Sequence, residues 1–250
     1  EECPDFFPLG GRWVFWGANG RYLLGDFDGR RFDAAGGGPH TFSHGTAYAA
    51  QTWSQAPDGR VVQIAWLKGD KPGAPFNQQM TVACDLTLRD TAAGPRLASM
   101  PVPEIAALTA GEVAWRAPRL EAEAGAEARA EARSPRLDCG ELLDAELEAD
   151  LEKGTALELE LRGLTVTCDE SGIACCGHRA SLPLEGGRLR LRALVDRSSL
   201  ELFAADGLVN LPLPLIPRPG DGAVSLRVTR GCRRAPRLTV RRLRSAWCAA

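Results

Sequence analysis

The chain has 250 residues, of which 44% are apolar and 25% are charged, and its 30 basic and 32 acidic side chains give a formal charge of −2. This near-neutral balance argues against binding to nucleic acid through a basic surface and against attraction to an anionic membrane. No stretch approaches the roughly 18 consecutive apolar residues of a membrane span, so we expect one or two folded domains that do not cross a membrane.

Short apolar runs separated by glycine, proline and aspartate fill the first hundred residues, a pattern typical of all-β structure. Asp-Gly pairs at 28–29 and 58–59 are typical of tight hairpin turns. We therefore expect antiparallel, aromatic-rich sheets in this half of the chain. The expected strands include 12–15, 22–24, 47–53 and 61–67.

The sequence changes character near residue 101. Met100-Pro101-Val102-Pro103 is expected to be an extended connector, because each proline disfavours helix in the residue before it. We place the boundary between two domains here, with the first domain at 1–105 and the second at 106–250.

Beyond the connector, apolar and charged residues alternate, most clearly in 157–162 and 188–195. Alternation gives each strand one dry and one wet face, which predicts a two-sheet β-sandwich. The arginines of 188–195 then form a solvated outer face rather than an anion site. We also expect a strand within 119–133 and a closing strand from 238 to 247.

Eight cysteines lack the C-x-x-C spacing of a zinc site or redox pair. Cys168, Cys175, Cys176 and His178 look at first like a metal cluster, but neighbouring residues on a strand point to opposite faces. We therefore expect buried free cysteines and no metal site, although an even count leaves disulfides possible. The cysteines are at positions 3, 84, 139, 168, 175, 176, 232 and 248.

Six segments carry motifs that resemble those of one enzyme family. They are E-C-P-D-F-F at 2–7, A-Y-A-A-Q-T-W at 47–53, Q-I-A-W-L at 63–67, P-F-N-Q-Q-M-T at 75–81 continuing to L-T-L-R at 86–89, L-V-D-R-S-S-L-E-L-F at 194–203 and R-L-R-S-A-W at 242–247. Each is similar to a motif of glycoside hydrolase family 32, the β-fructosidases that include levanases, exo-inulinases and invertases. One motif alone would carry little weight, whereas six in the same order along the chain are specific.

The resemblance implies the last blades of a five-bladed β-propeller, with the active site at its central channel, followed by a C-terminal β-sandwich. It also implies hydrolysis of β-fructofuranosyl linkages in levan, inulin or sucrose with retention of configuration. In that family an aspartate of W-M-N-D-P-N-G is the nucleophile, the glutamate of E-C-P is the general acid/base, and an aspartate of R-D-P holds ring hydroxyls. Two carboxyl groups share the work, as in retaining glycosidases generally.

Carried over residue by residue, the resemblance makes Glu2 the general acid/base. By their positions in the matching strands, Tyr48 is expected to hydrogen-bond Glu2 and Trp66 to stack on the fructose ring. The alternative for these two aromatic residues is that they belong to the propeller core. No metal or organic cofactor is expected, because the chemistry needs only carboxylates and water.

The chain departs from the family pattern at the other two carboxylates. Nothing matches W-M-N-D-P-N-G or R-D-P, since Arg89-Asp90-Thr91 is only R-D-T, and Asp26 and Asp28 belong to a turn. The resemblance therefore places both aspartates, with about three blades of roughly 40–45 residues each, before residue 1. We expect a truncated chain that is inactive alone.

Three functions stay open. The chain is a portion of a β-fructosidase, a carbohydrate-binding β-sandwich module, or an accessory subunit that completes a propeller with a separate N-terminal chain. The intact Glu2 segment favours the first. The expected partner is a fructan or sucrose-type carbohydrate, together with the missing propeller segment. No signal peptide opens the chain, so the protein is extracellular or periplasmic if an upstream segment carries one, and cytoplasmic otherwise.

Overall fold

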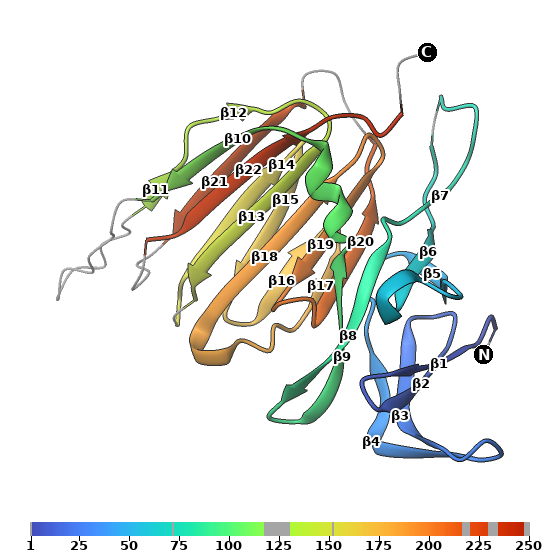
Figure 1. Cartoon of the computed structure of the whole chain (residues 1–250). Coiled ribbons are helices and arrows are strands. Elements are labelled where there is room, and N and C mark those ends of the chain that lie inside the picture. Colours follow the sequence, from blue (N-terminus) through green and yellow to red (C-terminus); the bar gives the residue numbers. More distant parts are fainter. Residues whose placement is uncertain are drawn as a thin grey trace. The chain divides into compact units, whose positions relative to one another are not determined.

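A computed structural model describes residues 2–71, 73–117, 131–151, 153–216, 221–229 and 235–247 of the chain. Their regular structure is strand apart from three short 3-10 helices, which confirms the predicted all-β fold (Figure 1). Contacts divide the chain into two compact units, 1–103 with 206–214 and 104–205 with 215–250. The chain thus passes between the units three times, whereas the predicted division at residue 105 has one crossing.

The first unit contains two antiparallel sheets. One is the meander β1-β2-β3-β4, and the other has the order β5-β6-β8-β9 with β7 paired to β6. The elements of this unit are β1 (Asp5–Leu9), β2 (Arg12–Trp16), β3 (Arg21–Phe27), β4 (Phe32–Thr41), β5 (Ala47–Thr52), the 3-10 helix η1 (Pro57–Gly59), β6 (Val62–Leu67), β7 (Gln79–Met80), β8 (Cys84–Thr91), β9 (Gly94–Pro101) and β20 (Val209–Pro214).

Turn residues close these sheets as the sequence predicts. The Asp28 carboxylate accepts the backbone N–H groups of Arg30 and Arg31, both at 2.7 Å, and so closes the β3–β4 turn. These two hydrogen bonds lower the pKa of Asp28. At the second Asp-Gly pair, Asp58 and Gly59 both have positive φ (60° and 68°), a conformation that glycine and aspartate tolerate.

The two sheets of the first unit share one core. Alternation along β1 sends Phe7 into this core and Phe6 to the opposite face of the sheet, where it stacks on Trp13 with ring centroids 4.7 Å apart. Inside the core, the Leu97 N–H donates to Tyr22 Oη at 3.0 Å, which links the first sheet to the second. The core residues are Phe7, Val14, Trp16, Tyr22, Leu24, Phe42, Ala50, Ala65, Leu86 and Leu97.

The second unit is a sandwich of two antiparallel sheets. In one sheet the strands run β10-β22-β13-β18-β19, and in the other β11-β21-β14-β15-β16-β17, with β12 paired to β21. The elements are η2 (Pro103–Leu108), β10 (Thr109–Arg116), β11 (Glu131–Arg133), β12 (Leu137–Asp138), β13 (Leu143–Asp150), β14 (Ala156–Leu161), β15 (Leu164–Asp169), β16 (Gly172–Cys175), β17 (His178–Ala180), η3 (Glu185–Gly187), β18 (Arg188–Val195), β19 (Ser199–Ala204), β21 (Ala223–Thr229) and β22 (Arg237–Leu243).

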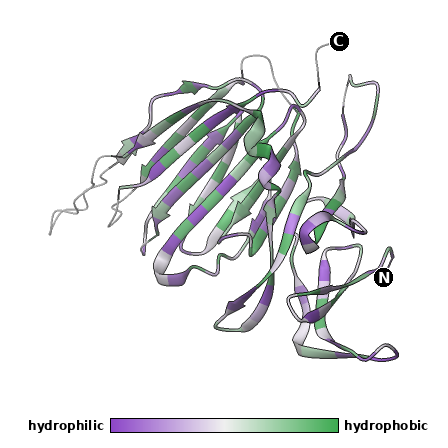
Figure 2. Ribbon diagram, in the orientation of Figure 1, coloured by the Kyte–Doolittle hydropathy of each residue, from purple (hydrophilic) through white to green (hydrophobic). Residues whose placement is uncertain are grey.

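The predicted alternation builds the core of this sandwich. Leu157, Leu159 and Leu161 are each 1% exposed, and hydrophilic and hydrophobic bands alternate across the strands in Figure 2. The closing strand ends at Leu243 rather than at Trp247, because Trp247 is 84% exposed and has no core to join. Residues 118–130 of the predicted strand at 119–133 lie outside the described residues, and 131–133 form β11.

The predicted solvated arginine face is wrong for Arg192. Its side chain is only 17% exposed and makes a bidentate pair with Asp144 at 2.9 and 3.0 Å. Asp144 is itself 2% exposed. The alternating pattern assigns arginine to the outer face, but cross-strand neighbours cover the middle of that face. Arg188 and Arg190, nearer the end of the strand, are exposed as predicted.

The six described cysteines are thiols, and four of them are buried as predicted. Cys3 and Cys176 are exposed, against the prediction. Both lie outside the strands, whereas three of the four buried cysteines lie within them. Burial raises the pKa of the Cys168 thiol to about 12. No described group of three histidine, cysteine or acidic side chains could hold a metal ion, and no described helix could span a membrane. Cys232 and Cys248 lie outside the described residues.

Tyr22 contributes stability to the first unit that is lost at alkaline pH. Burial raises the pKa of its phenol above 10, so its contribution is complete below pH 10 and is lost as pH rises through the folded-state pKa. Tyr22→Phe should flatten this alkaline decline and cost about 1 kcal/mol at neutral pH, because the Leu97 N–H loses its acceptor. Urea unfolding between pH 8 and 11 measures both effects. Tyr48→Phe, as the control, should keep the decline, and an unchanged slope in Tyr22→Phe would contradict this account.

Asp144→Ala should destabilise the sandwich by about 3 kcal/mol or more, because it leaves the largely buried Arg192 without its carboxylate. Glu141→Ala is the matched control. Its pair with Arg197 is exposed (60% and 54% for the side chains), so the loss should stay below about 1 kcal/mol. Urea unfolding followed by circular dichroism compares the two variants. Equal losses of stability would show that the Asp144–Arg192 pair contributes no more than the exposed Glu141–Arg197 pair.

Candidate active site

Hydrogen bonds from β5 hold the E-C-P-D segment in place. Gln51 Nε2 donates to the Cys3 carbonyl oxygen at 3.1 Å, and the Thr52 N–H donates to Asp5 Oδ2 at 2.6 Å. Cys3 has a φ of 44°, a conformation that non-glycine residues adopt rarely and only where surrounding contacts enforce it. Gln51 and Thr52 belong to the A-Y-A-A-Q-T-W motif, so two of the six sequence motifs meet here in space.

Glu2 is fixed at both its main chain and its side chain. Its carbonyl oxygen accepts the Ala18 N–H at 3.1 Å, and its Oε2 accepts the Tyr48 hydroxyl at 2.7 Å. The hydrogen bond between Tyr48 and Glu2 that the sequence predicts is therefore present. The Glu2 residue itself is exposed.

A bulge in β5 aims Tyr48 at Glu2. The pairing of β5 with β6 shifts register between Tyr48 and Gln51, and Ala49 within the bulge has a φ of 51°. The Ala49 N–H donates to the Ala18 carbonyl oxygen at 2.8 Å, which ties the bulge to the loop that also holds Glu2. Bulges commonly redirect side chains beside active sites.

Tyr48 and Trp66 form an aromatic pair beside Glu2. They are direct cross-strand partners on β5 and β6, with ring centroids 6.2 Å apart and an interplanar angle of 82°. Trp66 is 38% exposed, and the core instead takes the nearby Ala50 and Ala65. Neither ring thus belongs to the buried core of the first unit, and their contact with sugar stays a prediction.

Lys68 completes this group, and the sequence analysis missed it. Its ammonium Nζ lies 3.4 Å from the centroid of the Tyr48 ring and 4.9 Å from that of Trp66. A cation over an aromatic face is attracted by the negative face of the ring. Sequence spacing could have identified it. Residues two apart on an extended chain share a face, and Lys68 follows Trp66 by two positions.

The P-F-N-Q-Q-M-T motif supports β6 from its other side. Gln78 Oε1 accepts the Gly69 N–H at 2.9 Å, and Thr81 Oγ1 accepts the Ala65 N–H at 3.0 Å. Met80 pairs across from Trp66 and is 53% exposed. This motif therefore positions the strand that carries Trp66 and leaves apolar surface beside the indole.

The aspartates considered for a second catalytic carboxylate have structural roles. Arg12 Nη1 donates to both carboxylate oxygens of Asp26 at 2.9–3.0 Å, and Asp28 closes a turn as described above. In the second unit, the V-D-R-S-S-L-E-L-F motif is also structural. It forms the β18–β19 hairpin, in which the Asp196 N–H donates to the Ser199 carbonyl oxygen at 2.9 Å.

A sequence-family model described as "Glycosyl hydrolases family 32 C terminal" matches residues 161–231 of the chain. The chain is 26% identical to a levanase of Bacillus sp. (strain L7), over 98% of this chain and 31% of that protein. It is 23% identical to a levanase of Bacillus subtilis (strain 168), over 98% of this chain and 43% of that protein. The chain thus spans less than half the length of either relative.

Solved structures show the same fold over nearly the whole chain. Exo-inulinase from Aspergillus awamori superposes with a TM-score of 0.79 at 19% identity, over 98% of this chain and 57% of that one. β-Fructofuranosidase from Schwanniomyces occidentalis gives 0.72 at 17% identity, over 98% and 60%. Sucrose-6-phosphate hydrolase from Lactobacillus gasseri gives 0.72 at 16% identity, over 98% and 55%.

The contact of Lys68 with the aromatic pair should be measurable as stability. Lys68→Met keeps most of the alkyl chain but removes the charge, so it should cost the first unit about 0.5–1 kcal/mol. Lys68→Arg retains a cation and should cost less than half of that. Urea unfolding followed by tryptophan fluorescence reads the difference, and equal stabilities of the two variants would argue against a cation–π contribution.

Proposed function

We propose that the chain is a member of glycoside hydrolase family 32 and that it supplies the acid/base part of a site that hydrolyses β-fructofuranosyl linkages with retention. The supporting observation is the placement of Glu2, whose Oε2 accepts the Tyr48 hydroxyl while β5 holds the E-C-P-D backbone. The substrate class is a fructan or a sucrose-type fructoside. This choice rests on relatives described as levanases and on neighbours described as exo-inulinase and β-fructofuranosidase.

Glu2 performs two proton transfers in this proposal. As a carboxylic acid it protonates the glycosidic oxygen while a carboxylate nucleophile attacks the anomeric carbon, and as a carboxylate it then takes a proton from the incoming water. The Tyr48 hydroxyl engages Oε2. Oε1 is therefore the oxygen that carries the transferred proton. The hydrogen bond from Tyr48 fixes the direction in which the Glu2 carboxyl group points.

The aromatic pair provides the sugar-binding surface. Trp66 presents an indole that is 38% exposed, and a fructose ring stacks on it through its C–H groups. The Lys68 ammonium lies above the same pair and donates to sugar hydroxyls at the edge of that surface. Both side chains stand beside Tyr48, so the stacked sugar lies next to Glu2.

The nucleophile comes from outside these 250 residues in this proposal. No W-M-N-D-P-N-G or R-D-P segment occurs in the chain, and Asp26 and Asp28 are committed to structural contacts. Without the nucleophile the double displacement has no covalent route. The 250-residue chain should therefore not hydrolyse fructosides by itself.

The test is to assay the 250-residue chain alone and again with any in-frame coding sequence found immediately upstream. We expect hydrolysis of levan, inulin or sucrose only in the second case. There Glu2→Gln should lower kcat by about 10²–10⁴-fold, because proton donation to the leaving oxygen is lost. Asp26→Asn, an exposed carboxylate of the same unit, is the matched control and should keep most activity. Hydrolysis by the chain alone, or full activity in Glu2→Gln, would refute the proposal.

A further inference from the structure

A ladder of opposite charges covers the outer face of the β10-β22-β13-β18-β19 sheet. The central strand β13 is acidic on this face, and arginines of the strands on either side of it pair with its carboxylates. Arg192 pairs with Asp144 at 2.9 Å, and Arg241 pairs with Glu146 at 3.0 Å and with Glu112 at 2.8 Å. The middle of the ladder is therefore neutralised within the sheet.

At one end of this sheet, two arginines lie next to each other. Arg116 on β10 and Arg237 on β22 are direct cross-strand partners, so two like charges stand side by side. Such a pair is destabilising unless another group compensates it. Across the parts of the chain that the structure describes, neither guanidinium has a hydrogen bond or an ion pair. The nearest acidic neighbour in register with Arg237 is Glu148, which pairs with Arg188 at 4.0 Å.

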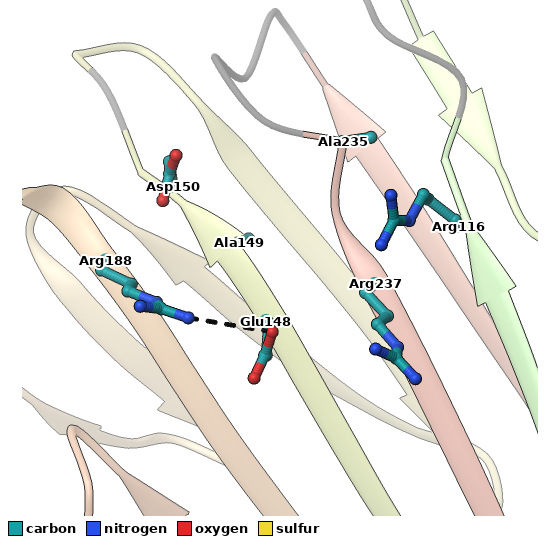
Figure 3. Close-up of a pocket in the computed structure, with 7 residues that line it drawn as sticks. All are labelled: Arg116, Glu148, Ala149, Asp150, Arg188, Ala235 and Arg237. Atoms are coloured by element: carbon teal, nitrogen blue, oxygen red, sulfur yellow. Dashed lines mark ion pairs between the residues drawn. The ribbon is translucent and has the colours of Figure 1, made fainter.

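A cavity of about 340 Å³ opens at this position. Figure 3 shows Arg116 and Arg237 on neighbouring strands at one side, and Arg188 reaching toward Glu148 at the other. Ala149 and Ala235 also line the cavity. The volume lies in the lower part of the range for small-molecule sites.

We propose that this cavity binds a small hydroxylated oxyanion, such as a sugar phosphate or a sugar acid. Arg116 and Arg237 present the two guanidinium groups, and guanidinium matches the geometry of phosphate and carboxylate oxygens through paired N–H donors. Glu148 and Asp150 line the same cavity and supply acceptors for ligand hydroxyl groups. The binding of an oxyanion relieves the repulsion between the two arginines.

The chemistry of the lining also sets limits on the ligand. A neutral sugar leaves the two arginine charges uncompensated, and a polyanion meets the carboxylates of Glu148 and Asp150 as well as the arginines. One oxyanion with several hydroxyls satisfies both halves of the lining. This site is independent of Glu2 and of the proposed hydrolysis, and it is testable on the 250-residue chain.

The test is titration of the chain at low ionic strength, followed by NMR of the arginine Nε–Hε groups. The probes are glucose 6-phosphate, glucuronate, inorganic phosphate and glucose. We expect saturable shifts with the sugar phosphate or the sugar acid, at least fivefold weaker binding of inorganic phosphate, and no saturable shift with glucose. Equal affinity for inorganic phosphate and glucose 6-phosphate would overturn the role of the carboxylates, and saturable glucose binding would overturn the oxyanion assignment.

Two double variants distinguish binding at this site from a general effect of positive charge. Arg116→Gln with Arg237→Gln should weaken binding at least tenfold, whereas Arg31→Gln with Arg197→Gln removes the same charge from exposed pairs elsewhere and should change it less than twofold. Removal of a like-charge pair should leave folding intact, which circular dichroism checks. Equal weakening in both double variants would show an adventitious ion only and would refute the site.

Discussion

The proposed active site depends on the hydrogen bonds that tie residues 2–5 to β5. Gln51 Nε2 donates to the Cys3 carbonyl oxygen and the Thr52 N–H donates to the Asp5 carboxylate, so a segment with a positive φ at Cys3 has one defined path. Glu2 directly precedes this path, and its carboxylate is oriented by the Tyr48 hydroxyl. Without these contacts an exposed glutamate outside any strand would sample many positions.

The position of β5 in turn depends on the shared core of the first unit. Ala50 and Ala65 enter this core from β5 and β6, and Tyr22 of the first sheet accepts a backbone hydrogen bond from Leu97 of the second. On β6, alternation buries Ala65 and turns Trp66 outward. On β5, Tyr48 and Ala50 are two positions apart, and the bulge between Tyr48 and Gln51 separates their side chains. Exposure of the aromatic pair therefore depends on both the strand register and the bulge.

Much of the fold follows from the sequence, since alternation of apolar and charged residues predicts the sandwich strands and Asp-Gly pairs predict two of the turns. The contact between Tyr48 and Glu2 came from motif resemblance, because local pattern does not bring together residues 46 positions apart. Lys68 was missed, since its stacking depends on the pairing of β5 with β6. The burial of Arg192 was missed as well, because periodicity assigns a face to a side chain but not the neighbours that cover it.

Chemical rescue is the sharpest test of our proposal that Glu2 acts as the general acid/base of a retaining β-fructosidase. In an active protein that contains this chain, Glu2→Gln would be assayed on an aryl β-fructoside with and without added azide. A retaining enzyme whose acid/base is missing still forms the fructosyl–enzyme intermediate, and azide attacks it without general-base assistance. We expect azide to raise the rate above that of the same variant without azide, and to give a β-fructosyl azide product of retained configuration. No rescue, or a product of inverted configuration, would contradict it.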